Sequence, residues 1–415
     1  MELGSKLAKI KKAAQQLRLS SLKQRNQVLL LAANSLLARQ EEILTANKND
    51  LVSVASTATP AFKDRLTLTP ERLKQMSISL KQVAALPDPL AEKLPTKTLK
   101  NRLKLRQVRA PLGVIFMIFE SRPNVAIEAF SMGFKSGNAM ILRGGKESLK
   151  TVGVLFDILL QSIKSTGLST DTLWGIDNPD RELVSKLLTQ KDFIDVVVPR
   201  GGDGLIQFVV DNSKIPIIKN DRGLCHVYAH EDADLQMATK IVVNAKTQRP
   251  GVCNSMETLL VHEKIAAKLL PLVVLQMKVF GVQWWGCEKT RQILKDTLTV
   301  QLANDVSYST EYLDQKINCK VVANLDEALG HIEKFGSRHS EAIVTKSKRT
   351  AARFQREVDA AVTYWNASTR FTDGFEFGLG GELGISTQKL HVRGPVGLKA
   401  LTNVRWVVDG KGQIR

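Results

Sequence analysis

Cys253 is the residue whose type and setting best suit covalent chemistry. It follows a Pro-Gly pair, between a helix that the pattern predicts over 232–246 and a strand predicted over 258–261. A break of this kind places a side chain at the mouth of a fold rather than in its core. Lys246 and Arg249 lie just upstream, and nearby positive charge favours the nucleophilic thiolate. Most lone cysteines are small buried hydrophobic residues, so the rest of the chain must decide.

The composition is that of an ordinary globular chain, long enough for two domains or three. It has 415 residues, 43% of them hydrophobic, and its apolar runs fall far short of the roughly 20 residues that a membrane helix requires. The four cysteines form no Cys-x-x-Cys pair, and the six histidines form no His-Glu-x-x-His motif. We therefore expect no membrane span, no metal site and no disulfide scaffold, and the few cysteines suit a reducing compartment such as the cytoplasm.

The net charge of +18 is the unusual bulk property. A strongly basic chain is one feature of nucleic-acid binding proteins. Here the basic residues are spread along the whole chain, and no recognisable nucleic-acid motif accompanies them. A solvated basic surface, compatible with a basic cleft for an anionic ligand, is the expectation.

The N-terminal segment has no acidic residue over 3–40, which is one feature of an organelle transit peptide. Apolar residues also recur at helical spacing from Leu3 to Leu17. That spacing favours an amphipathic helix packed by its apolar stripe.

Beyond residue 100 the pattern changes to strands alternating with helices. The predicted strands cover 103–108, 114–119, 139–142, 195–198, 215–218, 257–261, 320–322, 342–345 and 361–366. Helices are predicted over 125–136, 148–165, 232–246 and 264–280, and from residues 326 and 348. This alternation indicates parallel sheets covered by helices on both faces. We predict two doubly wound α/β domains that meet near 246–253, with ligands at the carboxyl ends of the strands.

Two glycine-rich turns follow predicted strands. The first, at 143–148, fails the P-loop pattern because Glu147 stands where Ser or Thr should follow the lysine. It is either an anion-binding turn or a tight turn with solvated charges. The second, at 200–204, does not match Gly-x-Gly-x-x-Gly, although a glycine turn before a helix suits a pyrophosphate. For this turn the plain structural interpretation is favoured.

A polar segment at 366–374 follows the last strong predicted strand. It is rich in hydroxyl and amide groups and contains Arg370. Such groups suit the carboxylate of an amino acid, although an ordinary polar loop explains the segment equally simply.

Together these segments resemble the γ-glutamyl phosphate reductase family, also called glutamate-5-semialdehyde dehydrogenases, of the aldehyde dehydrogenase superfamily. The likeness extends from about residue 7 to residue 414, in one continuous order. It is carried by residues 120–125, 137–147, 176–181, 244–250, 253–254, 331–345, 366–374, 386–391 and 393–395.

The resemblance implies an aldehyde-dehydrogenase-like α/β fold with a cofactor domain, a catalytic domain and a small oligomerisation element. We place an NADPH-binding domain at 1–245, with 100–112 as the oligomerisation strand. The catalytic domain with the cysteine loop is placed at 246–365. Residues 366–415 are expected to hold the substrate-anchor loop and then to return to the cofactor and oligomerisation region.

The resemblance also implies an activity, the NADPH-dependent reduction of L-glutamyl 5-phosphate to L-glutamate 5-semialdehyde with release of phosphate. This is the second step of proline synthesis from glutamate. It implies a cytoplasmic homo-oligomer, a dimer or tetramer, with glutamate 5-kinase as the candidate supplier of the substrate and without nucleic acid, membrane or metal.

In this chemistry Cys253 is the nucleophile, because a thioester divides the reduction of an acyl phosphate into two easier steps. The oxyanions that form need fixed donors, and the candidates are the Cys253 N–H and the Asn124 side chain. The alternative for Asn124 is a cap for the helix that follows it.

The remaining candidates bind ligands. Glu311 resembles the residue that holds the nicotinamide ribose, and Arg143 also suits a 2′-phosphate. The other cofactor candidates are Gly144, Lys146, Gly201, Gly202 and Gly204. The substrate candidates are Arg122, His339, Asn366, Ser368, Thr369, Arg370 and Arg393.

Two other functions compete with this interpretation. A hydrolytic aldehyde dehydrogenase of the same fold carries a Glu base ahead of the cysteine, but the matching stretch, 219–223, contains no Glu. A non-catalytic protein that uses its basic surface is the second alternative, and the intact setting of Cys253 argues against it.

Overall fold

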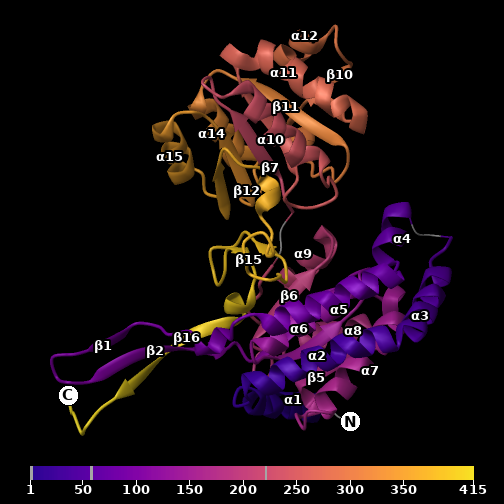
Figure 1. Ribbon diagram of the computed structural model, residues 1–415, viewed down its shortest axis with the longest axis vertical. Helices are drawn as coiled ribbons and strands as arrows, with labels where there is room; N and C mark the ends of the chain where they lie inside the picture. Colours follow the sequence, from indigo (N-terminus) through magenta and orange to yellow (C-terminus); the bar gives the residue numbers. More distant parts are fainter. Residues whose placement is uncertain (1–2, 57–58, 220–221) are drawn as a thin grey trace. The chain divides into compact units, whose positions relative to one another are not determined.

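The computed structural model describes residues 3–56, 59–219 and 222–415, and only the backbone of residues 60 and 61. Two compact units make up the chain (Figure 1). The first contains Met1–Asn220, Gly378–Gly384 and Val396–Arg415, and the second contains Asp221–Phe377 and Ile385–Pro395. Neither unit is therefore one continuous stretch of sequence.

The first unit begins with a group of helices. These are α1 (Leu3–Leu17), α2 (Leu22–Ala38), α3 (Gln40–Ser53), α4 (Pro60–Leu66) and α5 (Pro70–Ala85). The apolar stripe of α1 is buried, and Leu7 and Ile10 pack in the same core as Val114 and Phe116. The expectation of an amphipathic N-terminal helix is confirmed. Ser21 begins α2 with a capping box, because its side chain accepts the Gln24 N–H while the Gln24 side chain accepts the Ser21 N–H.

A four-stranded parallel sheet in the order β5-β4-β3-β6 is the centre of the first unit. Its elements are β3 (Val114–Phe119), α6 (Asn124–Lys135), β4 (Ala139–Arg143), α7 (Leu149–Lys164), β5 (Leu173–Ile176), α8 (Arg181–Leu187), β6 (Val196–Arg200) and α9 (Asp203–Asn212). All six residues of β3 are buried, as its continuous apolar run predicts. The expected strand over 215–218 is reduced to one bridge between Val197 and Ile217, because Pro216 lacks the N–H that a ladder requires.

A separate antiparallel sheet, β1-β2-β16, extends away from the helices of the first unit (Figure 1). It consists of β1 (Thr96–Thr98), β2 (Lys104–Pro111) and β16 (Thr402–Asp409). Each of the eight residues of β16 has a partner in β2, from Thr402 opposite Pro111 to Asp409 opposite Lys104. The last strand of the chain thus completes a sheet that begins near residue 100.

The second unit contains a seven-stranded parallel sheet in the order β10-β9-β11-β8-β7-β12-β13. Its strands are β7 (Cys225–Ala229), β8 (Met256–His262), β9 (Gln283–Gly286), β10 (Val300–Leu302), β11 (Lys316–Val322), β12 (Ser340–Val344) and β13 (Val362–Trp365). Its helices are α10 (Leu235–Thr247), α11 (Glu263–Met277), α12 (Glu288–Leu294), α13 (Asp305–Tyr308), α14 (Leu325–Phe335) and α15 (Lys348–Glu357). A short pair, β14 (Ile385–Ser386) and β15 (Gly394–Pro395), follows.

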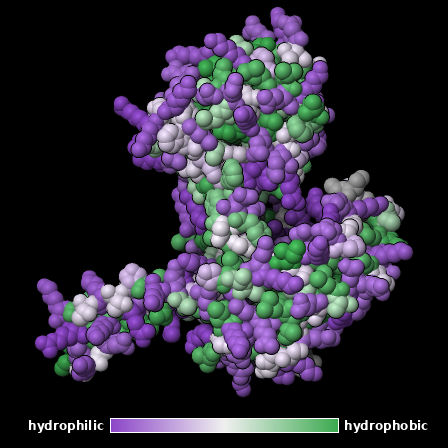
Figure 2. All heavy atoms as spheres, in the orientation of Figure 1, coloured by the Kyte–Doolittle hydropathy of each residue, from purple (hydrophilic) through white to green (hydrophobic). Residues whose placement is uncertain are grey.

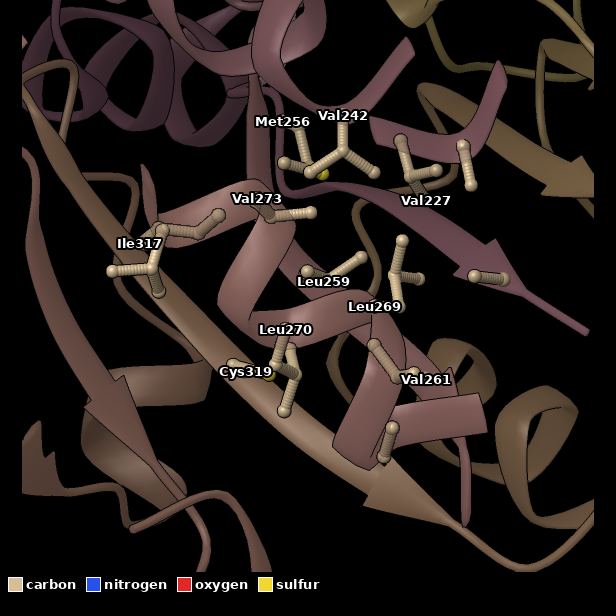
Figure 3. Close-up of a cluster of buried hydrophobic side chains, with 14 of the residues drawn as sticks. Val227, Val242, Met256, Leu259, Val261, Leu269, Leu270, Val273, Ile317 and Cys319 are labelled. Carbon is tan, nitrogen blue, oxygen red and sulfur yellow. The ribbon is translucent and has the colours of Figure 1, made fainter. Parts of the chain in front are cut away.

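Both faces of this sheet bury apolar side chains. On one face α10 and α11 contribute Val242, Leu269 and Val273 to a core with Leu259 of β8 (Figure 3). On the other face α14 and α15 pack around Tyr228 in a second core. The predicted doubly wound α/β architecture is confirmed.

The division between the units differs from the expected one. The sequence analysis assigned β7 and most of α10 to the cofactor domain at 1–245. In the structure β7 pairs with β8 and β12, and α10 packs with α11. Both elements belong to the second unit because strand pairing over long sequence separations, which local patterns do not reveal, sets the boundary.

Hydrophilic residues cover most of the face shown in Figure 2 in each unit. Over the described part of the chain, no helix is both long and apolar enough to cross a membrane.

Candidate active site

Cys253 lies in the turn that joins α10 to β8, and its side chain is half-buried. Asp234 begins α10 by accepting the Met237 N–H with its side chain. The helix ends at Thr247, shortly before Pro250, which cannot continue it. All four cysteines are thiols rather than disulfides. The exposed turn predicted from the Pro-Gly pair is therefore present, with the thiol partly open to solvent.

A buried ion pair lies beneath this turn. Lys246 Nζ is 2.8 Å from Glu257 Oε2, and each side chain has at most 1% of its surface exposed. The second Glu257 oxygen accepts the Leu313 N–H at 3.2 Å. Burial raises the pKa of Glu257 to about 7 and lowers the pKa of Lys246. Lys246, one of the two upstream positive charges noted for the thiol, is thus paired with Glu257.

The segment that leads into β7 lies directly against the Cys253 carbonyl group. The Cys225 thiol donates to the Cys253 carbonyl oxygen at 3.2 Å. A Cβ atom at position 223 would overlap that same oxygen, so the close approach requires glycine. Glu311, the candidate ribose ligand, accepts the Gly223 N–H at 2.8 Å.

The polar segment at 366–374 is hydrogen-bonded to Asn254, the residue after Cys253. Asn254 Nδ2 donates to the Thr372 carbonyl at 2.8 Å, and the Thr369 hydroxyl donates to the Asn254 carbonyl at 2.8 Å. Ser368 accepts the Arg370 N–H at 3.3 Å, beginning a short 3₁₀ turn. This loop therefore positions the cysteine turn, a role that its hydroxyl-rich composition did not reveal.

The Asn366 side chain is hydrogen-bonded to the backbone of Thr345, the residue after β12. Its side-chain oxygen accepts the Thr345 N–H and its amide donates to the Thr345 carbonyl, each at 3.0 Å. It adopts a left-handed conformation with φ of 56°, which asparagine tolerates better than most residues. Its side chain thus forms the turn after β13 in this structure.

Arg370 supplies positive charge at the cysteine turn. Its Nε donates to Gln248 Oε1 at 2.8 Å. Burial lowers the pKa of the Arg370 guanidinium, as does Arg249, while Asp373 and Cys253 act in the opposite direction. The guanidinium and the Cys253 thiol are thus close enough to interact electrostatically.

His339 and Arg393, the other substrate candidates in this unit, have different surroundings. His339 is fully buried, with Nδ1 2.8 Å from Ser340 Oγ. Arg393 Nη1 pairs with Asp359 at 2.8 Å, while its buried Nε and Nη2 have no hydrogen-bond partner among the described residues. Arg393 therefore retains donors for an anion.

The candidate cofactor residues of the first unit lie at the carboxyl ends of β4 and β6. Glu120 accepts the Gly202 N–H at 2.9 Å at the start of α9, and Gly201, Gly202 and Gly204 are all exposed. In the neighbouring turn, Glu147 accepts the Ser121 N–H at 2.8 Å. The two glycine turns thus meet one edge of the sheet, as the parallel topology predicts.

Arg143 ends β4 and is half-buried. Its Nη2 donates to the Pro179 carbonyl at 3.1 Å, and its buried Nε has no hydrogen-bond partner in the part of the chain that the structure describes. Burial lowers the pKa of Arg143, partly offset by Glu147. Gly144 packs against Phe119, whereas Lys146 is exposed. This edge therefore offers glycine turns and spare guanidinium donors to an anionic ligand.

Arg122 lies between β3 and α6, Asn124 begins α6, and both are half-buried. Asn124 is the first residue of α6, and its Nδ2 donates to Glu128 Oε1 at 2.8 Å. The N-cap is Pro123, without a side-chain cap. The alternative interpretation of Asn124 as the helix cap is wrong, because the helix starts one residue earlier than that role requires.

Sequence reasoning missed Gly223 and Cys225 as neighbours of the cysteine turn. Both stand before a short apolar run, but no local pattern relates that run to residue 253. Among the described residues, no group of three or more His, Cys, Asp or Glu is arranged to hold a metal ion.

Comparison with known proteins places this arrangement in a family. The model of the aldehyde dehydrogenase family matches residues 2–284. The γ-glutamyl phosphate reductase of Carboxydothermus hydrogenoformans is 49% identical over 408 residues, 98% of each chain. That of Moorella thermoacetica is 46% identical over 416 residues, covering 100% of this chain and 99% of the relative.

A solved structure extends the likeness to three dimensions. The crystal structure of γ-glutamyl phosphate reductase from Thermotoga maritima matches with a TM-score of 0.96 and 42% identity, over 100% of both chains. The chain belongs to the aldehyde dehydrogenase family, and within that family to the γ-glutamyl phosphate reductases.

Proposed function

We propose that this chain reduces L-glutamyl 5-phosphate to L-glutamate 5-semialdehyde, with NADPH as the reductant and release of phosphate. The observation that carries the proposal is the end-to-end likeness to relatives whose name states this substrate. Cys253 is half-buried in a turn whose next residue, Asn254, is hydrogen-bonded to Thr369 and Thr372. Its thiol would supply the nucleophile that this chemistry needs.

The first half-reaction is acyl transfer. The Cys253 thiolate attacks the acyl carbon, its sulfur forms a bond to that carbon, and the carbon–oxygen bond to phosphate breaks. Phosphate leaves with the electron pair, and the glutamyl group remains as a thioester on Cys253. Arg370, which interacts electrostatically with Cys253, is suited to stabilise the thiolate.

The second half-reaction is reduction of the thioester. Bound NADPH would supply the hydride. The resulting thiohemiacetal on Cys253 collapses, its carbon–sulfur bond breaks, and the aldehyde leaves while the thiolate is restored. The Cys253 N–H and the Asn124 amide are the proposed donors to the oxyanions, and each well-placed donor contributes roughly 3–4 kcal/mol.

The first unit is proposed to hold the adenosine end of the cofactor. The turns with Gly144 and with Gly201, Gly202 and Gly204 would receive the pyrophosphate. The exposed Lys146 and Arg143, whose buried Nε is unpartnered within the described ranges, would add positive charge at this edge and at the 2′-phosphate. In the second unit Glu311 would hold the nicotinamide ribose.

The substrate is proposed to bind through the polar loop and the nearby cations. Ser368 and Asn366 would lie at the α-amino and α-carboxylate groups, and Arg122, Arg370 and Arg393 would contact anionic groups. His339 and Thr369 have no exposed surface. Their proposed contribution is to hold the residues that touch the substrate.

We also propose a cytoplasmic homo-oligomer, a dimer or tetramer, held through the β1-β2-β16 sheet. Val404, Trp406 and Val408 alternate along β16, so they share one face, and each is at least 42% exposed. An apolar face of this kind suits a second copy. Light scattering of Trp406→Glu should give a smaller mass than that of the parent chain.

The proposed reaction is tested most directly in reverse. Pyrroline-5-carboxylate, which is in equilibrium with the aldehyde, is supplied with NADP, and NADPH formation is followed with and without inorganic phosphate. Strict dependence on phosphate supports the proposal. Equal turnover without phosphate would point to a hydrolytic aldehyde dehydrogenase, because water would then receive the acyl group.

A further inference from the structure

A chain of polar side chains, half-buried at Tyr364 and buried at its other members, ends at the backbone of Cys253. It begins at the Tyr364 hydroxyl, which is 2.8 Å from Thr372 Oγ1. Thr372 Oγ1 is 2.7 Å from Ser340 Oγ, and Ser340 Oγ is 2.8 Å from His339 Nδ1. The same His339 nitrogen lies 3.7 Å from the Cys225 thiol.

Cys225 is the last member of this chain. Its side chain has no exposed surface, and its thiol donates to the Cys253 carbonyl oxygen at 3.2 Å. Burial holds the pKa of the Cys225 thiol well above its ordinary value. The sulfur therefore keeps its proton, and remains a donor, over the pH range in which an enzyme of this kind works.

The bond matters because the Cys253 carbonyl and the Asn254 N–H belong to one rigid peptide plane. Holding the oxygen fixes the orientation of that plane, and with it the direction in which the Cys253 side chain leaves the backbone. Asn254 is held on its other side by Thr369 and Thr372. Hydrogen bonds to the Cys253 carbonyl and to Asn254 together fix the orientation of the Cys253 side chain.

We propose that Cys225 is a positioning residue for the reaction proposed above, and that its thiol aims Cys253 by holding the Cys253 carbonyl. The inference rests on the proposed function, but it assigns to Cys225 a task that the motif around Cys253 does not include. Cys225 acts through the backbone of the nucleophile and does not touch the substrate.

The alternative is that Cys225 only fills space at the start of β7. Two substitutions separate these roles. Cys225→Ser keeps a donor in nearly the same place, whereas Cys225→Ala removes it. Cys319→Ala is the matched control, because Cys319 is also fully buried in this unit, where its sulfur accepts from Thr290.

The first measurement is the rate at which iodoacetamide alkylates Cys253 in the full chain, read by peptide mass spectrometry so that labels on other cysteines are counted separately. The second is kcat and KM in the reverse reaction. Misplacement of a reacting group by about 1 Å costs roughly 100-fold. We expect Cys225→Ala to lower kcat by roughly tenfold to 100-fold and to change Cys253 alkylation, with the KM for NADP unchanged.

Cys225→Ser should restore most of kcat, and Cys319→Ala should leave kcat and Cys253 alkylation unchanged while lowering stability. Equal kcat values for the Ala and Ser variants would overturn the proposal, as would a Cys225→Ala variant that behaves like the parent. If Cys225→Ala does not fold, Cys225→Val fills the space without a donor and makes the same comparison.

The alkylation measurement also separates this inference from the proposed function. A parent chain without phosphate-dependent turnover would contradict the proposed function, whereas the alkylation rates would still report whether Cys225 aims Cys253.

Discussion

The cysteine turn of the second unit and the glycine turns of the first are constructed in different ways. Around Cys253 the neighbours are backbone atoms and buried side chains, and Gly223 lies against the Cys253 carbonyl itself. At Gly201 and Gly145 the nearest atoms are the carboxylate ends of Glu120 and Glu147, and such side chains can move aside. The turn around Cys253 is therefore held by atoms that cannot easily move, whereas the carboxylates at the glycine turns can move away from the backbone.

Breaking the ion pair beneath the turn should have the largest effect. Lys246→Met leaves Glu257 buried without its cation, and removing one partner of a buried pair costs about 3 kcal/mol or more. Urea unfolding of the full chain should show this loss in the transition of the second unit. Lys334→Met is the control, because its pair with Asp305 is at least 60% exposed on both sides and is worth about 0–1 kcal/mol. Equal losses for the two variants would contradict this assignment.

A substitution that crowds the turn around Cys253 should have the second-largest effect. Gly223→Ala places a Cβ against a backbone oxygen that cannot move without shifting Cys253. We expect turnover in the reverse reaction to fall by roughly 100-fold while NADPH still binds. Gly330→Ala in α14 meets nothing within 4 Å. It should retain full turnover and gain about 0.5–1 kcal/mol of stability. A fully active Gly223→Ala variant would show that the turn is less rigid than described.

Acid should affect the units unequally, because all six histidines lie in the second unit. Burial lowers the pKa of His331 to about 2. Below the ordinary value near 6.5 the unfolded chain therefore takes up a proton that the folded chain does not, and stability is lost as the pH falls. Between pH 7 and pH 5 His331 alone contributes a loss of about 2 kcal/mol, whereas the raised pKa of Glu257 acts in the opposite direction over the same range. Urea unfolding of the parent chain and of His331→Phe at both pH values should therefore show pH dependences that differ by about 2 kcal/mol. An unchanged dependence in that variant would assign it to another group.

The smallest effect is expected at Arg143, on the edge of the first unit's sheet that carries the glycine turns. Arg143→Gln removes a guanidinium proposed to lie at the 2′-phosphate. The KM for NADPH should rise by about tenfold, equivalent to about 1.4 kcal/mol, with little change in the KM for NADH. Steady-state kinetics with both cofactors measures the difference. A parallel rise for both would place Arg143 at a part of the cofactor that the two share.

Local patterns predicted most of the fold and the turn that carries Cys253. The apolar run at Val114–Phe119 and the Pro-Gly break before Cys253 are features that a few adjacent residues create. The placement of β7 failed because its partners, β8 and β12, are set by long-range pairing. The neighbours of the cysteine turn were missed for the same reason, since Cys225 and Thr372 approach it from distant parts of the sequence.

The pairing of β16 with β2 has a consequence for how this chain is made. A ribosome synthesises a chain from its N-terminus. Strand β2 therefore emerges roughly 300 residues, and at least about 15 seconds, before its partner β16. During that interval one side of β2 presents unpaired N–H and C=O groups, a known route to aggregation. The basic side chains of Lys104, Arg106 and Arg109 would then repel the same strand on neighbouring nascent chains. Translation must thus pass residue 409 before the first unit can complete this sheet.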